Sequence, residues 1–120
     1  MPQFMLILSG APNDMDGLSP TEIQAILEKY NAWTGKLAAA GKLVAGNKLT
    51  DDGGKALSLK GDRLTAVDGP YSETKEIVGG YFVVKAADYD EAIKLASDCP
   101  HLPMGPITVR QIDFMGRPET

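Results

Sequence analysis

Phe4-Met5-Leu6-Ile7-Leu8 is an unbroken apolar run near the start of the chain, and Ser9-Gly10 ends it. A strand with one face in water alternates apolar and polar residues, because successive side chains point to opposite faces. An unbroken run therefore predicts a strand that is buried on both faces. Any fold for this chain has to provide a cover on each side of that strand.

The segment that follows predicts a long helix with a well-defined start. Ser19 suits the N-cap, Pro20 suits the first helical position, and Glu22 completes a capping box. Gly41 is placed to end the helix in a left-handed conformation. One apolar face follows at helical spacing and consists of Ile23, Ile26, Leu27, Tyr30, Trp33 and Leu37.

The remaining segments predict strands and one further helix. Asp88 and Glu91 are suited to start the second helix, and Pro100 stops it. Gly46 is typical of a bulge or of a point of close approach. The expected strands, which are rich in alternating or β-branched residues, cover 42–49, 55–60, 63–67, 78–85 and 107–112. Gly61-Asp62 joins the second and third of these strands as a β-hairpin.

The order of these elements predicts the fold class. With the hairpin treated as an insertion, the order is βαββαβ, the ferredoxin-like pattern of α+β proteins. Two helices cover only one face of such a sheet, whereas the first and fourth main strands are apolar on both sides. Packing two sheets face to face would cover the other side. We therefore expect a single domain over residues 1–120 that forms a homodimer, a dimeric α+β barrel.

Composition narrows the classes of partner. The 120 residues are 43% hydrophobic and 23% charged, which is typical of a globular chain. A net charge of −4 without a basic cluster argues against nucleic-acid binding. Cys99 is the only cysteine, which fits a reducing compartment. Since no early run resembles a signal peptide or a membrane span, we expect a cytoplasmic protein that binds no membrane.

One segment carries a family resemblance. Asp68-Gly69-Pro70-Tyr71 precedes Glu73-Thr74-Lys75-Glu76, and a strand then starts at Gly79-Gly80-Tyr81. This segment resembles the DGPF-domain branch of the YCII-related family, with Tyr71 in place of the Phe of that branch. The likeness spans most of the chain and includes Pro100-His101-Leu102-Pro103-Met104-Gly105.

The resemblance implies a dimeric ferredoxin-like fold with a pocket between the sheet and its loops. Some YCII-like proteins are proposed to use a His–Asp pair as acid and base, with the His on the first helix. This chain has Tyr30 and Trp33 in that stretch and no histidine. The pair is therefore not carried over to this sequence.

The candidate site residues come from the signature segment and from the loop before the last strand. His101 is the only histidine, and histidine exchanges protons near neutral pH more readily than other side chains. We expect His101 and Asp68 to act as a general acid/base pair. The alternatives are that Asp68 only holds a turn and that His101 only bonds to backbone. The residues expected to bind a ligand are Tyr71, Glu73, Lys75, Gly80 and Arg110.

Arg110 has an alternative role as the partner of a loop carboxylate. Cys99 is expected to be structural, since it lies at a helix C-terminal end where the dipole opposes a thiolate. A single His without Cys or His at ligand spacing predicts no metal site. We expect no cofactor.

Two functions remain open from the sequence. The first is a small-molecule enzyme that uses acid/base chemistry in a pocket near the loop at 68–76. The second is a non-catalytic dimeric module that binds a ligand or a regulatory protein. The second is favoured by the absence of a recognisable catalytic constellation.

Overall fold

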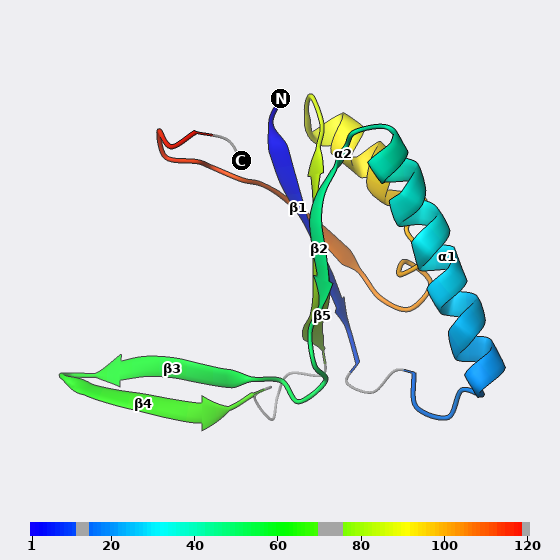
Figure 1. Ribbon diagram of the computed structural model, residues 1–120. Helices are drawn as coiled ribbons and strands as arrows, with labels where there is room; N and C mark the ends of the chain where they lie inside the picture. Colours follow the sequence, from blue (N-terminus) through cyan, green and yellow to red (C-terminus); the bar gives the residue numbers. More distant parts are fainter. Residues whose placement is uncertain (12–14, 70–75, 119–120) are drawn as a thin grey trace.

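The computed structural model describes residues 1–11, 15–69 and 76–118 (Figure 1). The elements within them are β1 (Gln3–Gly10), α1 (Pro20–Ala39), β2 (Leu43–Lys48), β3 (Lys55–Lys60), β4 (Arg63–Asp68), β5 (Ile77–Lys85), α2 (Tyr89–Ala96) and β6 (Ile107–Gln111). This order confirms the succession of helices and strands predicted from the sequence. No helix in the described part of the chain is long and apolar enough to cross a membrane.

The main sheet has four antiparallel strands in the order β2-β5-β1-β6. The apolar strand β1 lies in its centre, between β5 and β6. Strands β3 and β4 pair only with each other and form a separate two-stranded sheet. This topology confirms the predicted ferredoxin-like α+β fold with an inserted hairpin.

Both helices cover the same face of the main sheet (Figure 1). Every second residue of β1 is buried against them, because side chains alternate across a strand. The buried core consists of Phe4, Leu6, Leu8, Trp33, Leu37, Val84, Ala86, Ala92, Ala96 and Cys99. Trp33 also donates its indole N–H to the carbonyl of Leu95 at 3.1 Å, which ties the two helices together.

The start and end of α1 follow the sequence signals. Ser19 Oγ accepts a hydrogen bond from the Glu22 amide, and Glu22 Oε1 accepts one from the Ser19 amide, each at 3.1 Å. This is the predicted capping box. Gly41 follows the helix with φ +71°, the left-handed conformation expected of it.

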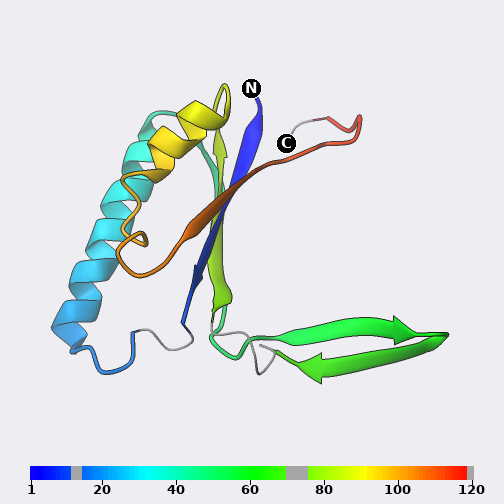
Figure 2. The same ribbon diagram turned by 180° about the vertical axis from the view of Figure 1, so that it is seen from behind.

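Within the described residues, no helix lies on the other face of the sheet (Figure 2). Met5 and Ile7 of β1 point to this face and are only half-buried. On the neighbouring strand β5, Val83 is in register with Met5 and Tyr81 with Ile7. The sequence predicted burial on both faces of β1, and the single chain supplies the cover on one of them.

Candidate functional site

A cavity of about 280 Å³ lies between the first half of α1 and the sheet, close to the ends of β1, β2 and β5. Its polar lining residues are Tyr30, Asn47, Lys48, Asp51 and His101. Its larger apolar lining residues are Leu8, Met15, Ile26, Leu27, Ile77, Phe82 and Met104. The cavity is thus an apolar pocket with a few polar groups, the usual character of a small-molecule site.

His101 enters this cavity from the turn region that follows α2. It is 6% exposed, and its Nε2 lies 2.7 Å from the carbonyl oxygen of Ser9, at the end of β1. A carbonyl oxygen only accepts hydrogen bonds, so Nε2 carries the proton and donates it. In the neutral ring, Nδ1 is then the nitrogen with a free lone pair.

Nδ1 of His101 forms no hydrogen bond with any described residue, and His101 is one of the residues that line the cavity. The ring is therefore oriented by Ser9 through one nitrogen and is available to a bound molecule through the other. This is how a general base is held in a fixed orientation.

Gly105 allows the loop to approach β1 this closely. A Cβ at position 105 would lie 2.2 Å from the Ser9 carbonyl oxygen and 3.1 Å from His101 Nε2. Any side chain there would push the loop away from the strand. The loop is also fastened by hydrogen bonds from the Ser9 amide to the Pro106 carbonyl and from the Gly105 amide to the His101 carbonyl, each at 3.1 Å.

Glycines also shape the sheet beneath the cavity. A Cβ at Gly46 of β2 would lie 2.4 Å from the ring of Phe82, so only glycine lets that ring lie across β2. The close approach at Gly46 is thus to a side-chain ring. On β5, a Cβ at Gly80 would lie 3.0 Å from the carbonyl oxygen of Asn47.

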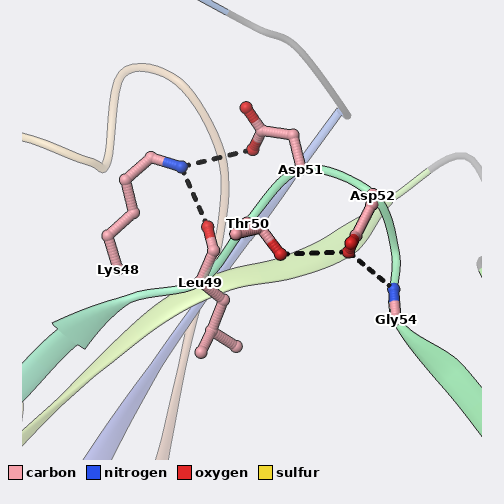
Figure 3. Close-up of polar contacts among 6 residues, drawn as sticks. All are labelled: Lys48, Leu49, Thr50, Asp51, Asp52 and Gly54. Atoms are coloured by element: carbon pink, nitrogen blue, oxygen red, sulfur yellow. Dashed lines mark hydrogen bonds and ion pairs between the residues drawn. The ribbon is translucent and has the colours of Figure 1, made fainter.

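Lys48 and Asp51, at the end of β2 and in the turn after it, line the cavity. Figure 3 shows the polar contacts of this turn. Lys48 Nζ donates to the Leu49 carbonyl at 2.9 Å and lies 3.3 Å from Asp51 Oδ1. Asp52 instead stabilises the turn, because its carboxylate accepts the Gly54 amide and the Thr50 hydroxyl, each at 3.0 Å. The Gly54 amide, and after it the Thr50 hydroxyl, lower the pKa of Asp52 below 3.8.

The predicted site residues are dispersed in the structure. His101 and Gly80 line the cavity, whereas Asp68 and Arg110 do not. Asp68 ends β4, has a side chain that is 81% exposed, and forms an ion pair with Lys55. The structure therefore does not bring Asp68 and His101 together, and their acid/base pairing stays a prediction.

Arg110 lies on β6 opposite Met5 and is exposed on the sheet face that carries no helix. Its predicted ligand-binding role has no support from the cavity, which lies on the other face. Tyr71, Glu73 and Lys75 lie outside the described residues. Among the residues that are described, no group of three or more His, Cys, Asp or Glu side chains is placed to hold a metal ion.

The sequence argument missed several polar lining residues. Tyr30 was expected on the apolar face of the helix, and it packs on the core while lining the cavity. Its helical spacing indicated which side of the helix it is on but not the cavity beside it. Lys48 was expected only as part of the strand at 42–49, and Asp51 had no expected role.

The structural class is an antiparallel α+β domain whose sheet is covered by two helices on one face, with a cavity between the first helix and the sheet. The chain belongs to the family of the YCII-related domain, since the model of that domain matches residues 3–115. A comparison with curated proteins found no match.

The fold is similar to a solved structure of TftG from Burkholderia phenoliruptrix AC1100. That protein is 5-chloro-2-hydroxyhydroquinone dehydrochlorinase, in complex with 2,5-dihydroxybenzoquinone. The two chains are 14% identical with a TM-score of 0.53, and the match covers 92% of this chain and 93% of that one. At this identity the likeness establishes the fold alone.

Proposed function

We propose that the protein is a small-molecule enzyme whose cavity holds a ring-sized substrate and whose proton-accepting group is His101 Nδ1. The observation that carries the proposal is the buried imidazole that lines the cavity and whose Nε2 is held by the Ser9 carbonyl, which leaves Nδ1 as the proton acceptor. A base oriented by a second group is the arrangement that acid/base catalysis requires.

The size and lining of the cavity support a class of substrate. An apolar cavity of about 150 Å³ accommodates benzene. A volume of about 280 Å³ therefore has room for one ring with a few substituents. Lys48 and His101 offer polar contacts to hydroxyl or carbonyl substituents, and the ring itself would lie against Phe82 and the aliphatic side chains. The ligand of TftG, a dihydroxybenzoquinone, is a compound of this kind.

A thermal-shift screen of small hydroxylated aromatic compounds, followed by product analysis of each hit, tests the proposal. His101→Gln keeps an amide donor for Ser9 and removes the basic nitrogen, so we expect binding to persist and turnover to fall by about 10²-fold or more. Lys94→Gln, an exposed residue of α2 that does not line the cavity, is the control and should leave turnover unchanged. Unchanged turnover in His101→Gln would show that His101 is not the base.

The alternative is a non-catalytic binding module. It is favoured by the position of Asp68, whose ion pair with Lys55 leaves His101 without the expected acid partner. A ligand that binds the cavity and is recovered unaltered after long incubation would support this alternative.

We also propose that the protein belongs to the DGPF branch, which the Asp68-Gly69-Pro70-Tyr71 segment supports. We propose that it acts in the cytoplasm, which its single cysteine supports.

We further propose that the protein forms a homodimer through the sheet face that carries no helix. The half-buried side chains of Met5 and Ile7 on that face support this proposal. A monomer mass in light scattering at micromolar concentration would contradict the homodimer.

A further inference from the structure

We propose that the β3–β4 hairpin is an arm that packs one apolar face against a second copy of this chain. This inference rests on the proposed homodimer and goes beyond it, because it assigns a partner contact to a segment outside the main sheet.

The hairpin has one strongly apolar face. The register pairs Leu59 with Leu64 and Leu57 with Ala66, so these four side chains share a face, which we call the leucine face. Leu57, Leu59 and Leu64 are 65%, 68% and 64% exposed. The opposite face is largely polar, with Ser58 opposite Thr65 and Lys60 opposite Arg63.

Such a hairpin needs a cover to be well ordered. A two-stranded hairpin alone is at best marginally stable in water, and a contiguous exposed apolar patch marks an interaction site. The chain does not fold back to supply that cover. Its radius of gyration is 16.5 Å, whereas a compact chain of this length would have about 14 Å.

The direction of the arm indicates that a second copy of this chain covers the leucine face. Both views place the hairpin on the side of the main sheet that faces away from the helices (Figures 1 and 2). That is the side on which the sheet face with Met5 and Ile7 lacks a cover. A second copy packed on this face would therefore lie beside the arm of the first.

The contact areas of the sheet face and the arm also favour a second copy as the partner. Four strands spaced about 4.8 Å apart and five residues long present a sheet face of about 300 Å². This footprint falls short of the about 800 Å² that each partner buries in a standard interface. An arm six residues long adds about 200 Å². In a symmetric pair, each copy gives one arm and receives one. The area that each copy contributes to the interface therefore rises to about 700 Å².

Sedimentation velocity over a dilution series of the full chain tests the proposal. The variant Leu57→Ser/Leu59→Ser/Leu64→Ser removes the leucine face, and we expect its dimer dissociation constant to rise by about tenfold or more per leucine. Val67→Ser is the matched control, because Val67 is an exposed apolar residue on the opposite face of the same hairpin. It should leave the constant unchanged.

The outcomes separate this inference from the homodimer proposal. A wild-type dimer whose dissociation constant is unaffected by the triple variant would overturn the arm and leave the sheet-face dimer standing. A wild-type chain that is monomeric throughout the series would overturn both.

A second measurement does not depend on the folding of the triple variant. A photo-crosslinking residue replaces Leu59, and isotopically labelled and unlabelled chains are mixed before irradiation. Cross-linked peptides that join the two labels would support the arm, and links confined to one chain would overturn it.

Discussion

At the scale of single residues, the candidate site depends on backbone contacts that leave little trace in a sequence. His101 stood out because it is the only histidine, but its orientation comes from the carbonyl of Ser9, 92 positions earlier. Gly105 makes that contact sterically allowed. Neither the spacing nor the chemistry of these residues reveals the contact, since it depends on how the last loop meets the first strand.

Gly105→Ala should disturb this contact. Because the new Cβ would lie 2.2 Å from the Ser9 carbonyl oxygen, we expect the free energy of unfolding to fall by about 1–3 kcal/mol. The His101 ring N–H signal in NMR, which is unambiguous in a chain with one histidine, should shift as its bond to Ser9 lengthens. Gly79→Ala is the matched control, because a Cβ there meets no atom within 4 Å. Equal losses from the two changes would contradict the steric argument.

Cys99 should make folding stability depend on pH in the alkaline range. Burial raises the pKa of its thiol above 9.0, and the His101 backbone N–H opposes this only in part. As pH rises through 9.0, the unfolded thiol ionises while the folded one keeps its proton, so the free energy of unfolding decreases. Urea unfolding of the wild type and of Cys99→Ala on both sides of pH 9.0 measures this contribution.

The difference between the two proteins isolates Cys99 from tyrosines and lysines that titrate in the same range. The decrease with pH should be smaller in Cys99→Ala. Identical pH dependence in both proteins would show that the thiol contributes nothing.

At the scale of elements, α1 combines strong signals with one weak position. Gly35 lies inside the helix, and a Cβ there would meet no atom within 4 Å. Gly35→Ala should therefore stabilise the protein by about 0.5–1 kcal/mol, through the lower conformational entropy of the unfolded chain. Ser19→Ala should instead cost about 1 kcal/mol, because the Glu22 amide loses its cap. Chemical denaturation of both variants would detect opposite shifts, and shifts of the same sign would refute this account.

The elements were predictable because each one is specified locally. The capping box at Ser19, the glycine at 41 and the apolar run of β1 act within a few residues of themselves. The cavity is different, since it forms where α1, two strand ends and the loop with His101 meet. The periodicity of α1 placed Tyr30 toward the sheet, but the gap beside it depends on glycines of other strands. Local patterns therefore gave the fold and only part of the site.

At the scale of the whole molecule, the β3–β4 hairpin is structurally almost independent of the body, by which we mean the main sheet and the two helices. The hairpin joins the body where the Gly69 amide donates to the Gly54 carbonyl at 3.0 Å, so its two ends meet. Replacing residues 55–68 by a short glycine linker should leave the body folded. The fluorescence of Trp33, the only tryptophan, should keep its buried spectrum and one cooperative urea transition. A red-shifted spectrum or two transitions would show that the hairpin is part of the folding unit.

The central position of β1 has a consequence for the order in which the protein folds during synthesis. β1 is made first, yet Phe4 pairs with Val84 on one side and with Gln111 on the other. A growing chain therefore carries this apolar strand without a strand partner until β5 (Ile77–Lys85) has left the ribosome. Pairing over such separations is slow to close, and it exposes the strand to association with other chains meanwhile. The helix α1, made directly after it, is the first element able to shield that strand from water.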